Sequence, residues 1–487
     1  MNLRKQSIAL LLFAALVLGF SGAYAGGKLA NSTNDQEQQL KNDPESENSD
    51  GENILESPEN MAKVAQAFNL IQQHYIEDVE DEQLIEGAIQ GMLDTLEDPY
   101  SSYMDQETME RFNEQLESSF EGIGAEVSMV EGKVTIVAPI KDSPAEEVGL
   151  RPNDQILSID QESIEGLDLN EAVEKIRGEK GSEVVLEIQR PGVSESFEVT
   201  VIRDEIPIET VYPDVQSIDG KKTGILEVTS FSETTAEEFV TELDQMEADG
   251  IEGLVIDVRG NPGGLLNAVE DILDHFVPKD IPYIQIEDQQ GTKTPYYSNL
   301  EEKKDYPITV LIDEGSASAS EILAVAMKEM GYDVVGTTSY GKGTVQQAVP
   351  LGDGTTIKLT FYKWLSPKGT WINEVGVEPT IEIKQPDYFY THPVQVEEPL
   401  TFNQTGEKIE NIQMMLIGLG YDTGRKDGYF DEQTEQAIQS FQQDNDLKVS
   451  GKIDEETAGL IEAKVIEKIR NRDDDQQLEE ALKKLYK

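Results

Sequence analysis

Residues 1–60 change abruptly from an apolar run to a polar stretch. The apolar run, residues 8–20, follows two basic residues and precedes an Ala-Tyr-Ala sequence. This order predicts an export segment over residues 1–25. Its length suits either a cleaved signal peptide or a membrane anchor, and the pattern leaves both open. Residues 26–60 are rich in Asn, Gln, Ser, Asp and Glu, and so little apolar surface predicts a disordered acidic linker.

Helical spacing begins in the next region, residues 61–118. Apolar side chains recur there three or four positions apart, at Val64, Phe68, Ile71, Ile85, Ile89 and Met92. A period near 3.6 predicts at least two amphipathic helices. Because the region holds few residues to cover such a stripe, the stripe is a candidate dimer face as well as a candidate packing surface, and we expect a homodimer.

Strands dominate the chain between the N-terminal helices and residue 390, in two different patterns. Residues 119–204 hold short segments of alternating polarity and a helical insert, which predicts a small β-rich domain. Residues 205–390 hold continuous apolar strands that alternate with helical stretches near 234–248, 264–276 and 317–330. This alternation predicts an α/β layered core.

The last part of the chain contains a short internal repeat. The sequence DGYFDEQT at 427–434 is echoed by SGKIDEET at 450–457, and each copy is a glycine turn that leads into an acidic helix start. Two copies are too few for a solenoid and predict a small helical module over residues 400–466. Residues 467–487 predict a charged amphipathic helix, at the surface or in a dimer contact.

Composition narrows the classes of function. The 487 residues suit several domains. A net charge of -57 repels nucleic acids and anionic lipid surfaces at long range. We therefore expect no nucleic-acid partner, and membrane contact only through the N-terminal segment. The absence of cysteine excludes disulfides, thiol nucleophiles and thiolate metal ligands.

Histidine chemistry finds little support in the sequence. The chain has three histidines, His74, His275 and His392. None of them lies in an HExxH sequence or accompanies a Gly-x-Ser-x-Gly turn, so a zinc hydrolase or a Ser-His-Asp triad is poorly supported.

Ser318 lies where an apolar strand runs directly into a helix, in the sequence GSASASEI at 315–322. Such a corner can present a hydroxyl beside free backbone N–H groups, as a nucleophile requires. However, Ser318 and Glu321 also fit a capping box, in which the serine only caps the helix. Taken alone, this segment favours capping.

A lysine between two glycines offers a base. Lys342 lies between Gly341 and Gly343, after an apolar strand. If burial removes water from its ammonium group, its pKa falls from about 10.4 toward neutrality and the amine can act as a general base. Gln346, four residues on, could then orient the amine. The alternative is a solvated turn lysine beside a surface glutamine.

A third glycine-rich segment, DVRGNPGGLL at 257–266, follows an apolar strand and opens a helix. Backbone N–H groups in such loops bind anions. Gly263 or Gly264, together with the N–H group of Ala319, could stabilise the oxyanion of a tetrahedral intermediate. A phosphate-binding turn or plain tight packing is the alternative, although the segment lacks the lysine of a P-loop.

In this order, RGNPGG, GSASASEI and GKGTVQ resemble the motifs of the carboxyl-terminal processing (tail-specific) protease family, over residues 60–385. The resemblance implies a multidomain α/β (α+β) fold, with an α/β peptidase core, an inserted PDZ domain, N-terminal helices and a small all-α C-terminal module. It implies a serine endopeptidase that needs no cofactor and no metal. The roles that the family assigns fall on Ser318 as nucleophile, Lys342 as general base, Gln346 as its partner, and Gly263 and Ala319 as oxyanion donors.

The β-rich domain resembles the PDZ domain of the same family, through FEGIGAEV at 120–127 and SPAEEVGLRPNDQILSIDQ at 143–161. In such a domain, the loop Gly122-Ile123-Gly124 points backbone N–H groups at the terminal carboxylate of a peptide that adds as a strand. Arg177 matches a family position that couples PDZ placement to activity. The alternative is a solvated arginine at a helix end.

Residues 406–463 resemble a small helical peptidoglycan-binding domain. The expected partners are therefore the C-termini of protein or peptide substrates and, in addition, peptidoglycan. Relatives in spore-forming bacteria cut signalling proteins outside the membrane, so the resemblance implies regulatory proteolysis by an extracytoplasmic enzyme that is anchored in the membrane or secreted to the cell wall.

Two alternatives to this function stay open. One is a non-catalytic PDZ and wall-binding adaptor on a degenerate peptidase fold, and the other is a cell-wall hydrolase with paired carboxylates, for which no pair is placed.

Overall fold

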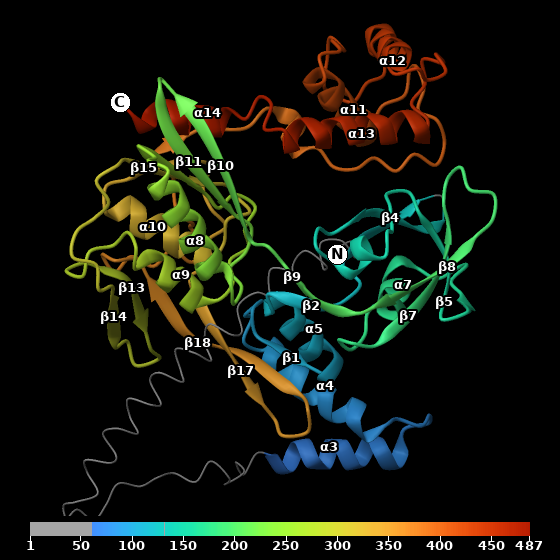
Figure 1. Ribbon diagram of the computed structural model, residues 1–487. Coiled ribbons are helices and arrows are strands. Elements are labelled where there is room, and N and C mark those ends of the chain that lie inside the picture. Colours follow the sequence, from blue (N-terminus) through green and yellow to red (C-terminus); the bar gives the residue numbers. More distant parts are fainter. Residues whose placement is uncertain (1–60, 131) are drawn as a thin grey trace, which may run out of the picture.

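The computed structural model describes residues 61–130 and 132–487 (Figure 1). The predicted export segment and acidic linker lie outside the described residues. Within the described ranges, no helix is long and apolar enough to cross a membrane. In the same ranges, no three His, Cys, Asp or Glu side chains gather as ligands for a metal ion.

The N-terminal region consists of helices with an uncovered apolar face. Its elements are α3 (Met61–His74), α4 (Asp81–Asp94), β1 (Ser102–Met104) and α5 (Gln106–Leu116). In the described part of the chain, α3 buries none of its residues and α4 buries only Leu93. Large apolar side chains remain exposed at Met61, Val64, Leu70, Ile71, Tyr75, Ile76, Ile85, Met92 and Leu96. The predicted amphipathic helices are thus confirmed, and no described residue covers their apolar stripe.

A two-stranded ribbon leads into and out of the β-rich domain. β2 (Ser119–Gly122) pairs with β9 (Asp204–Pro207), and the domain lies between them in the chain (Figure 1). Its sheet has the order β3-β4-β5-β7-β8, with β6 beside β5. The elements are β3 (Ala125–Val130), β4 (Lys133–Pro139), α6 (Pro144–Glu147), β5 (Gln155–Ile159), β6 (Glu162–Ser163), α7 (Leu169–Ile176), β7 (Glu183–Gln189) and β8 (Phe197–Ile202). Among the described strands, β3 pairs only with β4, which leaves it one edge for an added strand.

A six-stranded sheet in the order β10-β11-β12-β15-β16-β19 forms the centre of the largest core, and it is parallel from β11 onward. The strands are β10 (Val211–Ile218), β11 (Lys221–Val228), β12 (Gly253–Asp257), β15 (Ile308–Ile312), β16 (Asp333–Gly336) and β19 (Ile381–Glu382). Parallel strands between two layers are apolar on both faces, which explains their continuous apolar runs. Helices pack on one face, namely α8 (Thr235–Ala248), α9 (Leu266–Leu273) and α10 (Ala319–Glu329).

The C-terminal helix α14 (Gln476–Leu485) covers the other face of this sheet (Figure 1). Its side chains Leu478, Ala481, Leu482 and Leu485 pack on Ile225, Val255, Leu311 and Val335. The predicted amphipathic helix is confirmed, and its polar side, with Glu479 and Lys483, is exposed. The proposed dimer contact needs correction, because the apolar face of the helix covers an apolar sheet face of the same chain. Arg259, just after β12, also joins α14 to the core: its guanidinium pairs with Asp257 at 2.6 Å and with Asp475 at 2.8 Å.

A second sheet connects the N-terminal region to the core. Its order is β1-β18-β13-β14, and β17 also pairs with β18. These strands are β13 (Pro282–Glu287), β14 (Lys293–Tyr297), β17 (Thr344–Pro350) and β18 (Thr356–Leu365). In Figure 1 the β17–β18 hairpin reaches down to α4 and α5. The pairing of β1 with residues 356–358 of β18, opposite the end of β17, brings the N-terminal region next to this hairpin.

The C-terminal module repeats one small structural unit. Its helices are η1 (Asp387–Tyr390), α11 (Glu407–Gly418), α12 (Glu432–Asp444) and α13 (Glu455–Arg470). Asp431 caps α12 by accepting from Thr434 N, and Asp454 caps α13 by accepting from Thr457 N. A buried glutamine donates to each threonine hydroxyl in turn, Gln413 to Thr434 and Gln442 to Thr457. The predicted helix starts of the internal repeat are confirmed.

Candidate active site

The three glycine- or serine-rich motifs follow neighbouring strands of the parallel sheet. The 257–266 segment leaves β12, Ser318 follows β15, and Lys342 follows β16. These strands are adjacent in the order β12-β15-β16. Loops after adjacent parallel strands meet at one edge of a sheet, which is where such folds bind ligands. The sheet therefore gathers segments that are far apart in the sequence.

Ser318 is the N-cap residue of α10, with an unusual backbone. Its side chain is 3% exposed and its φ is 54°, whereas ordinary N-cap residues have extended backbones. Holding a serine in this region costs about 1–3 kcal/mol, a strain that is common at functional sites. The neighbouring serines are tied to backbone carbonyls, Ser316 Oγ to Val258 and Ser320 Oγ to Asn261. The strain distinguishes Ser318 from a serine that only caps a helix.

The glycine-rich loop lies directly against Ser318. A Cβ atom added to Gly263 would lie 2.9 Å from Ser318 Cβ and 3.0 Å from Ala319 N. Glycine is therefore required here, both for this close approach and for a φ of 102°.

The N–H group of Gly263 already has a partner. It donates to Asn261 Oδ1 at 2.8 Å, in the type of turn that asparagine forms with the residue two positions on. In this conformation Gly263 therefore does not offer the free N–H group that was predicted. The sequence alternative, Gly264, adjoins it, and Ala319 is the first residue of α10, where an N–H group has no partner within the helix.

The carboxylate of Glu321 joins the Ser318 corner to the Lys342 loop. Its Oε2 atom accepts from Ser318 N at 2.7 Å and from Lys342 N at 2.8 Å. Its Oε1 atom accepts from Ser339 Oγ at 2.6 Å and from Gly341 N at 2.7 Å. Burial raises the pKa of Glu321, although these four donors act against burial. The sequence pattern around Glu321 indicates only a capping box and carries no sign of this second role.

The backbone of Lys342 is held on the other side by both tryptophans of the chain. Trp364 Nε1 donates to Lys342 O at 2.8 Å, and Trp371 Nε1 donates to Gly343 O at 2.7 Å. A Cβ atom on Gly343 would lie 2.7 Å from Trp371 Nε1, so the flanking glycine permits the close packing. The loop is thus rigid and buried, in contrast to a solvated turn.

The side chain of Lys342 is 1% exposed, and its amine has no hydrogen-bond partner among the described residues. Nζ lies 4.1 Å from the ring centroid of Tyr100. Burial and then the positive charge of Lys358 hold the pKa of Lys342 well below its usual value, whereas Asp98 and Glu321 act in the opposite direction. The solvated alternative for Lys342 is wrong.

Gln346 is also fully buried, beside the lysine loop on β17. Its amide nitrogen donates to Thr344 Oγ1 and to Thr360 Oγ1, both at 2.9 Å. Its Oε1 atom has no hydrogen-bond partner within the described part of the chain. A buried amine and a buried amide oxygen are therefore both unpaired in the same site, and each is what the other requires. The surface alternative for Gln346 is also wrong.

Sequence analysis did not find three further residues of this site, namely Lys358, Asp98 and Tyr100. Lys358 is 2% exposed on β18, and burial lowers its pKa to about 8. The sequence carries no signal for it, because the alternation in TIKLTFYKWL at 356–365 has Ile357 and Leu359 as the apolar positions and Lys358 among the polar ones. Asp98 and Tyr100 lie in the turn between α4 and β1, where no motif marks them.

The predicted carboxylate loop of the PDZ-like domain is firmly held. A Cβ atom on Gly124 would lie 2.4 Å from Ser143 Cβ, and Ser143 Oγ donates to Gly124 O at 2.8 Å. The carbonyl of Ile123 accepts from Ala145 N at 2.8 Å. Gly122, the first residue of the loop, ends β2. The loop therefore lies between the entry ribbon and the free edge of β3, as a peptide-binding loop requires.

Arg177 ends α7 on the side of the entry ribbon. Its Cζ atom lies 5.1 Å from the ring centroid of Phe120 on β2. A Cβ atom on Gly122 would lie 3.8 Å from Arg177 Cγ. The arginine is exposed, yet it contacts the strand through which the domain is connected to the core.

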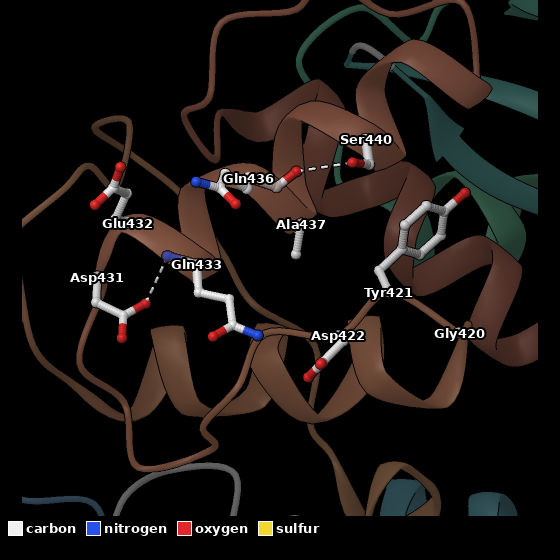
Figure 2. Close-up of a pocket in the computed structure, with 9 residues that line it drawn as sticks. All are labelled: Gly420, Tyr421, Asp422, Asp431, Glu432, Gln433, Gln436, Ala437 and Ser440. Carbon is white, nitrogen blue, oxygen red and sulfur yellow. Dashed lines mark hydrogen bonds between the residues drawn. The ribbon is translucent and has the colours of Figure 1, made fainter.

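The C-terminal module carries a polar groove of about 720 Å³. Figure 2 shows the side chain of Gln433 between the carboxylates of Asp431 and Asp422, with the ring of Tyr421 on the far side. Gln436 and Ser440 on α12 complete the polar lining. Carboxylates, amides and an aromatic ring together can bind a polar ligand.

Four family models match the chain. Residues 222–383 match peptidase family S41, residues 135–190 match a PDZ domain and residues 405–461 match a putative peptidoglycan binding domain. Residues 16–108 match the N-terminal domain of the activating protease CtpB. These matches define a serine peptidase that carries a PDZ domain.

Curated relatives extend the match to the whole chain. The chain is 50% identical to the carboxy-terminal processing protease CtpB of Bacillus subtilis, over 99% of this chain and 100% of that protein. It is 38% identical to the carboxy-terminal processing protease CtpA of the same organism, over 87% and 90%. A solved photosystem II D1 C-terminal processing protease is 24% identical, with a TM-score of 0.42 over 67% of this chain and 94% of that one. The chain therefore belongs to the carboxy-terminal processing protease family, within peptidase family S41, and the resemblance drawn from its motifs is confirmed.

Proposed function

We propose that the protein is an extracytoplasmic serine endopeptidase that uses Ser318 as nucleophile, Lys342 as general base and Gln346 to orient the amine. One observation carries this proposal: an unpaired and fully buried lysine amine, on a loop that shares the Glu321 carboxylate with the backbone of a strained serine. Burial keeps a lysine uncharged at neutral pH, and only an uncharged amine can accept a proton.

The reaction follows from these groups. Substrate binding brings Nζ and the unpaired oxygen of Gln346 into contact and turns the amine toward Ser318 Oγ. Lys342 accepts the serine proton while Oγ attacks the scissile carbonyl. The N–H group of Ala319 and that of Gly264, next to Gly263 whose own N–H group is bound to Asn261, stabilise the oxyanion. The lysine then gives its proton to the leaving amine, and water hydrolyses the acyl-enzyme with the same lysine as base.

The other modules select and locate the substrate. The PDZ domain binds a substrate C-terminus at Gly122-Ile123-Gly124, as a strand added to β3, and Arg177 relays its placement to β2 and the core. The uncovered stripe on α3 and α4 forms a homodimer. The groove beside Tyr421 binds peptidoglycan and holds the enzyme at the cell wall, where it carries out regulatory proteolysis.

Single-residue variants test the mechanism directly. Wild type, Ser318→Ala and Lys342→Ala are assayed on casein, with Ser440→Ala in the C-terminal module as a matched control. Both active-site variants should lose at least about 1000-fold in kcat/KM. Ser318→Ala should still bind a peptide that carries the C-terminal tail of a substrate. Undiminished cleavage by Ser318→Ala would require another nucleophile, and loss of cleavage in the control would show that the assay responds to folding instead.

The same assay separates the two alternative functions. A non-catalytic adaptor predicts tail binding without casein cleavage by the wild type. A cell-wall hydrolase predicts clearing of purified peptidoglycan in a gel, which the serine variant should not affect.

A further inference from the structure

The turn between α4 and β1, residues 98–101, is bound to the strand that lies beside the lysine. Asp98 is its centre: Oδ2 accepts from Ser101 Oγ and from Thr360 Oγ1, both at 2.6 Å, and Oδ1 accepts from Tyr100 N at 3.0 Å. Ser101 Oγ in turn accepts from Thr360 N at 3.1 Å. The side chain and the backbone of one β18 residue are therefore both bound to this turn, which comes from the N-terminal region.

This turn contacts both polar side chains proposed to act beside Ser318. The ring of Tyr100 faces the unpaired amine of Lys342, with 4.1 Å between Nζ and the ring centroid. Thr360 links the turn to the second group, because its hydroxyl donates to Asp98 and accepts from Gln346 Nε2 at 2.9 Å. One short segment thus lies against the amine and fixes the orientation of the amide.

We propose that residues 98–101 are a positioning element of the active site, in which Tyr100 keeps water from the Lys342 amine and Asp98, through Thr360, orients Gln346. This inference rests on the proposed Ser/Lys/Gln function. It makes the N-terminal region a part of the catalytic unit and not only a dimer contact. Any partner or second copy that moves α4 would also change the hydration of the lysine.

The ring of Tyr100 has two opposite effects on the amine. Its negative face attracts an ammonium ion, which raises the pKa. Its bulk excludes water from a group that is 1% exposed, and burial is the largest cause of the lowered pKa of Lys342. Exclusion of water is the larger effect, so loss of the ring should raise the pKa of Lys342.

The other groups that face the amine do not change this sign. Lys358 on β18 lowers the pKa, and Glu321 on α10 and Asp98 in the turn itself raise it, whether or not the ring is present. The hydroxyl of Tyr100 lies beside Tyr340, and burial first and then this neighbour raise the pKa of Tyr100 well above its usual value. The phenol of Tyr100 therefore stays neutral across the working range of the enzyme.

The test is the pH dependence of casein cleavage by wild type, Tyr100→Ala and Tyr100→Phe. The acidic limb of kcat/KM should move up by at least about 1 pH unit in Tyr100→Ala, with about a tenfold loss at pH 7 that is recovered above pH 9. Tyr100→Phe keeps the ring and should keep the wild-type limb. Tyr103→Ala removes a neighbouring tyrosine that contacts Glu86 instead of the lysine, and it should not move the limb.

Two results would overturn the proposal. An unmoved acidic limb in Tyr100→Ala would mean that the ring does not keep the amine dry. A faster reaction at pH 7 would mean that the ring restrains the lysine instead of preparing it. Lys342→Ala in the same experiment distinguishes a failure of the proposed Ser/Lys function from a failure of the role proposed for residues 98–101. If Lys342→Ala still cleaves casein, the Ser/Lys function itself fails, whereas an inactive Lys342→Ala beside an unaltered Tyr100→Ala rejects only the role of the turn.

Thr360 tests the second contact. Thr360→Val removes the hydroxyl between Asp98 and Gln346 at nearly constant volume and should lower kcat about tenfold with little change in KM, whereas Thr360→Ser restores the hydroxyl and should restore kcat. Equal kcat values in wild type and Thr360→Val would contradict the relay, and so would a failure of serine to rescue.

Discussion

Replacement of Lys358 by methionine should make the core more stable and the enzyme slower at neutral pH. Burial of this lysine, which is 2% exposed, lowers its pKa from 10.5 to about 8. In the unfolded chain the same lysine has its usual pKa, so the folded state binds fewer protons between pH 8 and pH 10.5. The folded state therefore gains stability as the pH rises through this window. Below pH 8 it bears the full cost of a buried ammonium, about 3 kcal/mol for a pKa difference of about 2.5.

Methionine has a similar length and no charge, so Lys358→Met should gain up to about 3 kcal/mol at pH 7 and almost nothing near pH 10.5. Urea unfolding followed by tryptophan fluorescence measures this gain. Both tryptophans, Trp364 and Trp371, lie beside the lysine loop, so the signal reports on the core and not on the other modules. Lys363→Met is the matched control: this lysine is on the same strand, its side chain is 46% exposed, and its replacement should change stability by no more than about 0.5 kcal/mol.

The effect on activity has the opposite sign. The charge of Lys358 lowers the pKa of Lys342, so the methionine variant should move the acidic limb of casein cleavage to higher pH. A variant that is both more stable and slower at pH 7 would show that a buried charge is retained for catalysis at the expense of stability. The reasoning is refuted if Lys358→Met is less stable than wild type at pH 7, or if its gain is the same at pH 7 and pH 10.

Three further predictions concern contacts outside the lysine amine. Glu321→Gln replaces one carboxylate oxygen by an N–H donor that faces other donors, so it should destabilise the core by about 2–5 kcal/mol in urea and reduce casein cleavage even under conditions where the variant is fully folded. Ile71→Lys places a charge in the uncovered apolar stripe of α3 and should convert a dimer into a monomer in light scattering without loss of helical circular dichroism; a monomeric wild type would contradict the dimer. Asp475→Ala leaves the guanidinium of Arg259 with one carboxylate in place of two and should cost about 3 kcal/mol in urea, and an unaltered midpoint would show that α14 is not fastened by this pair.

Much of the architecture could be predicted because each region has its own periodicity. The spacing of Val64, Phe68 and Ile71 is helical, and α3 is present. The continuous apolar runs of β12 and β15 indicate strands buried on both faces, and both strands lie inside the parallel sheet. The place of α14 could not be predicted, because an amphipathic helix shows that it needs an apolar partner surface but not which surface it covers.

The proposed site residues also differ in how far the sequence indicates them. Ser318 and Lys342 could be proposed because their motifs together resemble those of a known family, whereas each segment alone left helix capping and a solvated turn open. The donor at Gly263 could not be judged from sequence, because the partner of its N–H group, Asn261 Oδ1, depends on the local turn. The residues that change the chemistry of the lysine, Tyr100 and Lys358, belong to other elements and have no motif.

The parallel order β12-β15-β16 explains why the motifs meet although the sequence separates them. Each motif follows one of these strands, so the sheet alone gathers the glycine loop, Ser318 and Lys342 at one edge. Without further cover, a lysine at that edge would stay charged at neutral pH and could not accept a proton. The second sheet provides the cover for the lysine. Its strand β18 carries Lys358, and the turn that contains Tyr100 directly precedes β1, which pairs with β18. The position of the lysine thus depends on one sheet and its proposed role as a base on the other, and we predict that a change that separates β1 from β18 abolishes cleavage while the parallel sheet stays folded.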